Sequence, residues 1–425
     1  PLSEQLEIAS DFQPPLMHLI VHGLSLVSTS EWWLRLAALI PGLITIWFTM
    51  RLGEKWFSKS AGQFAGLLLA TSQFHQFYSQ ELRPYSLAAC FGVMTVWYWI
   101  NLMESKKRVS IGLFLSMLGG LYSMYVFPAV LLALFIITAI QYKQKLLLLS
   151  SYFLLLFLSF LPWLPSFLEQ LTIGTTYAAN KPVWSTMVSP PLIKMLPLVA
   201  AKFTLGRIPL EATATIIISA IIYAYLAVPL LLRSLQSRYG RLSLSCAVLP
   251  VMIAFCISLV VPVLDPKRVL FALPFFYLAL VAGYKKTVTF IGALLILISL
   301  NLTAVRSYAI NPDLQREPWR QAVADIEAKA QQHDVVIFPF SGPYAPWRWY
   351  QSKNLTTLSI TNPANESTQD KIIETTSSAT SIFTIDYLTE IHDPNRLITQ
   401  ILEKNDRTEV GFFQYPGIGK IRIVQ

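Results

Sequence analysis

Residues 62–103 read GQFAGLLLATSQFHQFYSQELRPYSLAACFGVMTVWYWINLM, two long apolar runs joined by the polar segment 78–85, YSQELRPY. Glu81 and Arg83 stand two positions apart in that segment. A charged side chain at bilayer depth costs roughly 2.5–3.5 kcal/mol, so such residues are expected at the membrane interface. Two interpretations fit: a plain polar turn anchored by Tyr78 and Tyr85, or a polar site at one mouth of a helix bundle.

The composition indicates a membrane protein with several spans. Of the 425 residues, 54% are hydrophobic and only 13% are charged, whereas soluble proteins carry about 25% charged residues. The net charge of +9 does not indicate a nucleic-acid partner, because many of the Lys and Arg residues stand in short loops between apolar runs. Cys90, Cys246 and Cys256 lie inside apolar runs and predict neither a disulfide framework nor a zinc site.

About ten apolar runs are long enough, or nearly so, to cross a hydrocarbon core of roughly 30 Å. Two of them, 109–123 and 125–141, are short, and a single helix there would reverse the orientation of everything that follows. We therefore expect a mainly α, polytopic membrane helix bundle. The runs cover residues 32–52, 62–79, 85–103, 109–123, 125–141, 146–165, 212–232, 243–264, 269–284 and 287–304.

Positive charge recurs in every second loop, as the cytoplasmic side of a cell-membrane protein requires. This regularity holds only if 109–141 forms two helices. The outside then contains four segments: the one around Glu81, the turn 265–268, the long segment 166–211 and the C-terminal tail. The basic loops contain Arg51, Lys55 and Lys59; Lys106, Lys107 and Arg108; Lys143 and Lys145; Arg233, Arg238 and Arg241; and Lys285 and Lys286.

Two apolar segments are better explained as helices lying on the membrane. The run that follows Gln13-Pro14-Pro15 ends near Val27 and is too short to span. The run LIKMLPLVAAKF at 192–203 carries Lys194 and Lys202 and predicts an amphipathic interfacial helix. The N-terminal residues are expected to lie in an extracytoplasmic loop that follows a further helix.

The sequence changes character at residue 305, where charge density rises and long apolar runs stop. QAVADIEAKAQQ at 321–332 has helical spacing, and DVVIFPF at 334–340 predicts a buried strand. SIFTID and GIGKIRIVQ predict further strands, and PNRLITQILEKN predicts another helix. We expect a membrane domain over 1–304 and a small extracytoplasmic α/β domain over 305–425.

With no Gly-rich phosphate loop, a nucleotide-driven pump is not favoured. A transporter or flippase for lipid-linked sugars would place charges at the bilayer midplane, whereas most charges here lie at the ends of the apolar runs. A non-catalytic membrane scaffold whose tail binds a partner is the other alternative.

The stretch 11–87, DFQPPLMHLIVHGLSLVSTSEWWLRLAALIPGLITIWFTMRLGEKWFSKSAGQFAGLLLATSQFHQFYSQELRPYSL, resembles the N-terminal half of GT-C superfamily glycosyltransferases. Within them it resembles protein mannosyltransferases and lipid A aminoarabinose transferases. The resemblance rests on the Pro14-Pro15 pair, the helix start around Glu31, the loop GEKWFSKSAG at 53–62 and the segment YSQELRPYSL at 78–87. It weakens through the middle of the chain, where DPKRVLFALP at 265–274 is similar to a basic outer turn.

The resemblance implies transfer of a sugar from a polyprenyl-phosphate carrier to a lipid, glycan or protein hydroxyl on the outer face, by single displacement with inversion. Family members use an Asp, usually in an Asp-Glu pair, upstream of a segment similar to PLSEQLEIASDFQPP. The expected catalytic Asp therefore precedes Pro1. Gln13 stands where the family often has His, which puts a metal or proton role there in doubt.

The candidate site residues follow from the chemistry of a departing lipid phosphate, which positive charge stabilises. Arg suits bidentate phosphate contacts, but Lys267 and Arg268 also fit as snorkelling anchors. Asp11 either binds hydroxyls or caps the next helix. Glu81 either holds Arg83 or binds a sugar hydroxyl; its use as a base is less favoured. The set comprises catalytic candidates Asp11 and Glu81 and substrate-binding candidates Arg83, Tyr85, Lys267, Arg268, Tyr122 and Tyr125.

Two further points concern the site. Tyr122 and Tyr125 fall at a predicted outer turn, where they line a donor groove or belong to the aromatic belt. His75 is expected to be a packed histidine rather than a ligand. The residues predict no metal site, and a divalent metal ion is the only cofactor that the interpretation leaves open.

Overall fold

The computed structural model describes residues 12–180, 191–207, 214–339, 345–360 and 366–425. The chain divides into two compact units, unit 1 (Pro1–Tyr308) and unit 2 (Ala309–Gln425). Asp11, one of the candidates named above, lies outside the described residues.

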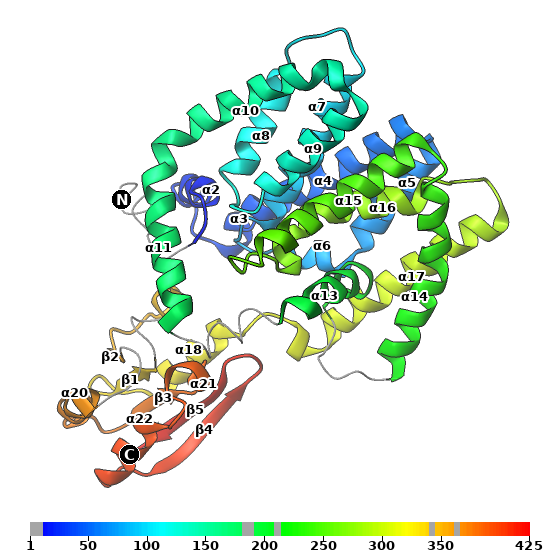
Figure 1. Cartoon of the computed structure of the whole chain (residues 1–425). Helices are drawn as coiled ribbons and strands as arrows, with labels where there is room; N and C mark the ends of the chain where they lie inside the picture. The colour runs from blue at the N-terminus through cyan, green and yellow to red at the C-terminus, as the bar shows by residue number, and fades with distance from the viewer. Residues whose placement is uncertain (1–11, 181–190, 208–213, 340–344, 361–365) are drawn as a thin grey trace. The chain divides into compact units, whose positions relative to one another are not determined.

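Unit 1 is helical (Figure 1). The elements are α2 Leu16–Ser25, α3 Glu31–Leu34, α4 Leu36–Trp56, α5 Lys59–Thr71, α6 Gln73–Tyr78, α7 Tyr85–Met103, α8 Ile111–Leu121, α9 Pro128–Gln141, η1 Lys143–Lys145, α10 Leu146–Phe160, η2 Leu161–Trp163, α11 Leu164–Asn180, α13 Leu192–Leu205, α14 Ala214–Ser234, α15 Arg238–Ile257, η3 Pro266–Ala272, α16 Leu273–Val281 and α17 Val288–Ile310.

Six helical segments among the described residues are long and apolar enough to cross a membrane. The expected count of about ten is therefore not confirmed. The difference has local causes: the run 62–79 is divided between α5 and α6, and the run 269–284 is divided between η3 and α16. The run 109–141 forms the two separate helices α8 and α9, as the alternation of basic loops requires. The six segments are Glu31–Trp56, Tyr85–Met103, Lys143–Gly174, Ile216–Ser234, Arg238–Ile257 and Val288–Ile310.

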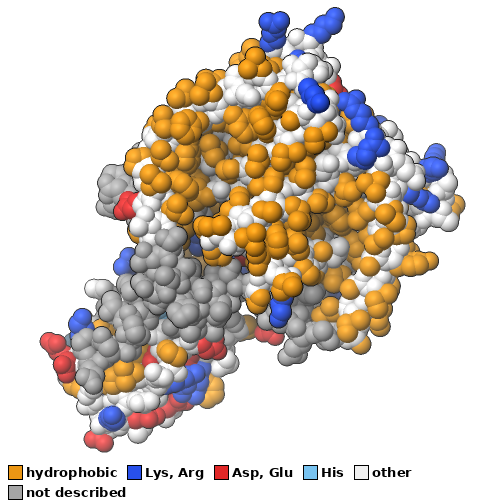
Figure 2. Space-filling view, in the orientation of Figure 1, with side chains coloured by type: hydrophobic (Ala, Val, Ile, Leu, Met, Phe, Trp, Pro, Cys, Tyr) orange, Lys and Arg blue, Asp and Glu red, His pale blue; other side chains and the backbone are white. Residues whose placement is uncertain are grey.

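The loops that were predicted to share the cytoplasmic side meet at one end of unit 1. The Glu104 carboxylate lies 3.6 Å from Lys55 Nζ and 3.5 Å from an Arg238 guanidinium nitrogen. Lys145 Nζ donates to the Lys107 carbonyl at 3.1 Å. In Figure 2, Lys and Arg side chains gather at this end, beyond a broad apolar surface. These contacts show that four of the five basic loops lie together at this end.

Helix α7 connects this basic end to the opposite end. It has 19 residues, which at 1.5 Å per residue span about 28 Å, close to the hydrocarbon thickness of a bilayer. Its last turn adjoins Glu104, so its first residue, Tyr85, lies a membrane thickness away from the basic loops. The segment 78–85 therefore occupies the other mouth of the bundle.

Unit 2 contains a five-stranded sheet in the order β2-β1-β3-β5-β4. β1 pairs in parallel with β2 and β3, while β5 pairs antiparallel with β3 and β4. The predicted helices and strands near 321–332, 334–340, 381–386, 394–405 and 417–425 are present, whereas β2 and β4 were not anticipated. The elements are η4 Pro312–Leu314, α18 Trp319–Lys329, β1 Val335–Phe338, α19 Ala345–Tyr350, β2 Thr356–Ser359, α20 Glu366–Thr376, β3 Ile382–Ile385, α21 Thr389–His392, α22 Leu397–Lys404, β4 Glu409–Tyr415 and β5 Gly419–Val424.

Both faces of the central strands β1 and β3 are buried, which explains why these strands appear in the sequence as unbroken apolar runs. Val336 and Phe338 pack in one cluster with side chains of α18 and α19. Val335 and Ile337, which point to the other face, pack with side chains of α20 and α22.

Candidate functional site

The short helix α6 is separate from α5 because Ser72, at φ −65° and ψ 114°, has an extended backbone and caps the start of a new helix. The Ser72 hydroxyl accepts a hydrogen bond from His75 N at 3.4 Å, as an N-cap does. His75 is 2% exposed, and its Nε2 lies 3.2 Å from the Gly42 carbonyl oxygen. His75 is thus packed in the bundle, while Tyr78 at the end of α6 faces the polar segment that follows.

Segment 79–84 turns tightly and sets two tyrosines against each other. Arg83 N donates to the Glu81 carbonyl at 2.7 Å, and Pro84 then starts α7. The rings of Tyr78 and Tyr85 meet edge to face with centroids 5.1 Å apart. The charge of Glu81 acts on both tyrosine hydroxyls. The turn therefore brings a carboxylate and two phenols together at the mouth of the bundle.

The turn before η3 reaches the same place from a distant part of the sequence. Asp265 caps η3 by accepting from Lys267 N at 3.0 Å, and its other oxygen lies 3.4 Å from Lys267 Nζ. Arg268 Nη1 lies 3.3 Å from the Pro262 carbonyl oxygen. The charges of Asp265 and Arg268 both act on Tyr85, so this turn adjoins the segment 79–84.

The residues at the end of α13 lie beside α6 and near Tyr78. Arg207 N donates to Gln73 Oε1 at 2.5 Å, and the Arg207 guanidinium lies 4.1 Å from the centroid of the Phe77 ring. These contacts fasten α13 beside α6 (Figure 1). Gly206, at φ +71°, makes the connection possible, since a Cβ there would approach Gln73 Oε1 to 2.5 Å. The charge of Arg207 in turn acts on Tyr78.

Lys202 belongs to this group as well. Burial lowers the pKa of Lys202 below its ordinary value, and the charge of Arg207 adds to this effect, while Asp265 opposes it. The arrangement thus gathers more positive than negative charge. We call it the polar cluster; it comprises Tyr78, Glu81, Arg83, Tyr85, Lys202, Arg207, Asp265, Lys267 and Arg268.

A buried network behind the polar cluster holds its elements in place. Asn301 Nδ2 on α17 donates to the Leu68 carbonyl at 3.1 Å and to the Tyr277 hydroxyl at 3.4 Å. Tyr277 in turn donates to the Phe203 carbonyl on α13 at 3.3 Å. One amide therefore ties α5, α16 and α17 together and, through Tyr277, reaches the helix that carries Lys202.

Five of the predicted site residues come together in the polar cluster: Glu81, Arg83, Tyr85, Lys267 and Arg268. Tyr122 and Tyr125 have their partners elsewhere, on α10, η2 and α11. The Tyr122 hydroxyl donates to the Ser159 carbonyl at 2.7 Å. The Tyr125 hydroxyl donates to Gln170 Oε1 at 2.7 Å and accepts from Trp163 Nε1 at 2.9 Å.

Sequence reasoning did not identify Lys202, Arg207 and Asp265 as site residues. The available signals were a lysine near the end of a predicted interfacial helix and the Gly206-Arg207 pair that ends it. Neither feature predicts which other segment of the chain this helix packs against. Among the residues that the structure describes, no group of three or more His, Cys, Asp or Glu side chains could hold a metal ion.

Comparisons with known proteins agree with this architecture. Residues 13–167, somewhat over a third of the chain, match the family model of dolichyl-phosphate-mannose-protein mannosyltransferase. No curated protein matches the chain. The fold is similar to the crystal structure of ArnT from Cupriavidus metallidurans in the apo state, with a TM-score of 0.59 and 12% identity over 97% of this chain and 87% of that chain.

ArnT from the same organism bound to undecaprenyl phosphate gives a TM-score of 0.58 at 12% identity, over 99% of this chain and 92% of that chain. At this identity the likeness concerns the fold. The family match covers residues 13–167, and the likeness of fold to ArnT covers nearly the whole chain.

Proposed function

We propose that the protein transfers a sugar from a polyprenyl-phosphate carrier to an acceptor hydroxyl at the extracytoplasmic face of the cell membrane, with inversion. The observation that carries this proposal is the polar cluster itself. It holds five cationic side chains against two carboxylates, at the mouth of the bundle opposite the basic loops. A lipid phosphate lies at that depth, with its chain in the bilayer and its charge at the interface.

The surplus of positive charge suits the leaving group. In the proposed reaction the acceptor oxygen attacks the anomeric carbon, the bond from that carbon to the phosphate oxygen breaks, and the lipid phosphate leaves with the electron pair. Negative charge grows on the phosphate as this happens, so cations placed nearby stabilise the transition state. Arg207, whose charge acts on Tyr78, and Arg268, whose charge acts on Tyr85, are our first candidates for this contact.

The acceptor proton must go to a base. Glu81 and Asp265 are the carboxylates of the polar cluster, and we assign Glu81 to binding or orienting a sugar or acceptor hydroxyl. Asp11 remains a candidate for the same task. The acceptor hydroxyl belongs to a lipid, a glycan or a protein. Tyr122 and Tyr125 remain candidates for lining the donor groove.

The lipid class of the donor is supported by the relatives. The solved ArnT bound to undecaprenyl phosphate shares this fold, and the matching family is described by a dolichyl-phosphate sugar. Both are polyprenyl-type phosphates. The positive-inside pattern supports the membrane orientation, with the polar cluster and unit 2 on the outer side.

The proposal is tested without knowing the acceptor, by measuring how undecaprenyl phosphate raises the thermal unfolding temperature of the protein in nanodiscs. A ligand that binds only the folded state stabilises it by mass action. We expect Arg207→Gln and Arg268→Gln each to weaken binding about 10-fold, because a hydrogen bond to a charged group contributes about 1.5–3 kcal/mol and part of it is screened at the interface.

Arg51→Gln is the matched control. Arg51 lies at the opposite end of the bundle, where it pairs with Glu54 at 2.7 Å and is half exposed. An exposed pair of this kind contributes about 0–1 kcal/mol, so the response to undecaprenyl phosphate should stay as in the parent protein. Equal responses in all three variants would reject the polar cluster as the phosphate site. No response in the parent protein would reject the lipid donor.

A further inference from the structure

Two loops at the basic end of unit 1 form one surface. The loop between α7 and α8 lies against η1, which connects α9 to α10. Lys145 Nζ in η1 donates to the Ser105 carbonyl at 3.0 Å and to the Lys107 carbonyl at 3.1 Å. The two loops are therefore fastened together. We call their five cationic side chains the cation cap, which comprises Lys106, Lys107, Arg108, Lys143 and Lys145.

No carboxylate offsets the charge of the cation cap. None of its five side chains forms an ion pair with another residue that the structure describes, and four of them, all except Lys145, are exposed. The one acidic residue of these loops, Glu104, is held elsewhere. Its carboxylate lies 3.6 Å from Lys55 Nζ and 3.5 Å from an Arg238 guanidinium nitrogen, and it accepts from the Tyr239 hydroxyl at 2.8 Å. The positive charge of the cap is therefore available to an external anion.

Strongly exposed apolar side chains adjoin the cation cap. Val109, directly after the cations of the first loop, is 72% exposed, and Ile111 at the start of α8 is 71% exposed. Leu147 in the first turn of α10 is 85% exposed. In Figure 2, Lys and Arg side chains at this end lie at the margin of the broad apolar surface. In a bilayer these apolar side chains face acyl chains, so the cations beside them lie at the level of the lipid headgroups.

The combination of charge and apolar surface limits the partner. A water-soluble polyanion would contact the cations but not the apolar side chains next to them. One polyprenyl phosphate brings a charge of about −1.5 to −2 and would leave most of the five cations without a partner. Several anionic phospholipids side by side supply one negative charge each, at the depth of the cap. Groups of four to eight Lys and Arg residues beside a spanning helix are typical of anionic-lipid binding.

We propose that the cation cap binds anionic phospholipids in the leaflet next to the basic loops. The lysine and arginine side chains donate hydrogen bonds to the phosphodiester headgroups, while the acyl chains contact Val109, Ile111 and Leu147. The cap lies at the end of the bundle opposite the polar cluster. The inference therefore does not depend on the proposed transfer reaction.

The experiment is native mass spectrometry of the full chain in detergent micelles, titrated with phosphatidylglycerol. Phosphatidylcholine with the same acyl chains is the neutral comparison, and undecaprenyl phosphate is the comparison with a single charged headgroup. We expect the parent protein to bind phosphatidylglycerol about 10-fold more tightly than phosphatidylcholine. The variant Lys106→Gln/Lys107→Gln should bind phosphatidylglycerol about 10-fold more weakly than the parent protein, with unchanged binding of the other two lipids.

The double variant Lys285→Gln/Lys286→Gln is the matched control. It removes the same charge from the basic loop between α16 and α17, where both lysines are exposed, as Lys106 and Lys107 are. That loop holds only two cations, so phosphatidylglycerol binding should stay within about 2-fold of the parent value. Because all four lysines are exposed, both variants should keep the unfolding temperature of the parent protein.

Three results would overturn the proposal. Equal binding of phosphatidylglycerol and phosphatidylcholine by the parent protein would show that the cap does not select anionic lipids. An equal loss of phosphatidylglycerol binding in both double variants would show that total charge alone sets the affinity. Weaker binding of undecaprenyl phosphate with unchanged binding of phosphatidylglycerol in Lys106→Gln/Lys107→Gln would assign the cap to the carrier lipid.

Discussion

Gly206 offers a decisive test of how the polar cluster is assembled. Its backbone, at φ +71° and ψ −148°, lies in a region that only glycine occupies readily, so Gly206→Ala should cost about 1–3 kcal/mol in backbone strain. The added Cβ would also come within 2.5 Å of Gln73 Oε1 and displace the bond to Arg207 N, at a further cost of about 0.5–1.5 kcal/mol. The combined loss is about 2–4 kcal/mol.

The first readout is thermal unfolding in nanodiscs, where this loss should lower the unfolding temperature by about 4–8 °C, at about 2 °C per kcal/mol for a unit of this size. The second readout is the response to undecaprenyl phosphate. Because Arg207 follows Gly206 directly, the variant should respond more weakly than the parent protein even well below its unfolding temperature.

Gly292→Ala provides the matched control. Gly292 lies inside α17, and a Cβ there would meet nothing within 4 Å. Alanine favours a helix over glycine by about 1 kcal/mol, so this variant should unfold at the same or a higher temperature. If Gly206→Ala behaved like Gly292→Ala in both readouts, the argument that Gly206 connects α13 to α6 would be refuted.

Three further predictions concern buried polar groups, all followed by thermal unfolding. Glu327→Gln should destabilise unit 2 by about 1–3 kcal/mol at neutral pH, because the Glu327 carboxylate accepts from Ser352 N and Lys353 N, each at 2.7 Å; an unchanged midpoint would contradict this. Burial alone would raise the pKa of Glu327. The two backbone hydrogen bonds, the hydrogen bond from the Ser352 hydroxyl and the charge of Lys353 outweigh burial and lower this pKa below 4.5. Its stabilising contribution is therefore complete above pH 4.5 and is lost as the pH falls through the folded-state pKa; a scan below pH 5 should show a smaller acid loss in Glu327→Gln than in the parent protein. Asn301→Leu should destabilise unit 1 by about 1–3 kcal/mol, since the Leu68 carbonyl and the Tyr277 hydroxyl lose their donor; a neutral result would mean that the network is not needed.

Much of the fold could be predicted because the apolar runs and the charges of the loops between them determine membrane topology. The division of 109–141 into α8 and α9 followed from the alternation of basic loops, and the contacts of Glu104 with Lys55 and Arg238 agree with it. The number of long spans could not be predicted in the same way. Hydropathy does not register a single capping residue such as Ser72, which separates α5 from α6 without interrupting the apolar run.

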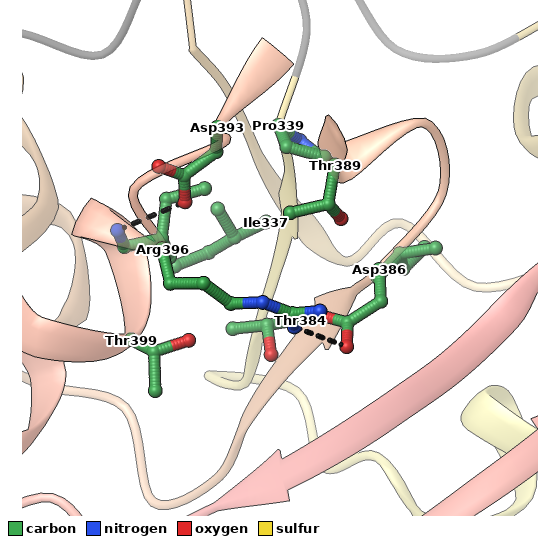
Figure 3. A pocket seen from close by; sticks show the side chains of 10 residues that line it. Ile337, Pro339, Thr384, Asp386, Thr389, Asp393, Arg396 and Thr399 are labelled. Carbon is green, nitrogen blue, oxygen red and sulfur yellow. Dashed lines mark hydrogen bonds and ion pairs between the residues drawn. The ribbon is translucent and has the colours of Figure 1, made fainter. Parts of the chain in front are cut away.

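The candidate site was predictable only where charge stood out in the sequence. Glu81 and Arg83 drew notice because they interrupt an apolar stretch. Arg207 and Asp265 meet Tyr78 through tertiary packing, in which α13 docks against α6, and no local pattern reports such docking. In unit 2, the Thr384 hydroxyl (Figure 3) has no hydrogen-bond partner among the described residues, and this could not be anticipated, because a Thr in an apolar strand resembles any other β-branched residue.

The surplus of positive charge in the polar cluster has a kinetic consequence under the proposed function. A polyprenyl-phosphate sugar is a phosphodiester with one negative charge, whereas the released polyprenyl phosphate is a monoester that carries about −1.5 to −2 at neutral pH. Five cations offset by two carboxylates would hold the more highly charged spent carrier more tightly than the fresh donor. Release of the spent carrier would then limit turnover. Added polyprenyl phosphate would be a strong product inhibitor, and its affinity would fall as the ionic strength is raised.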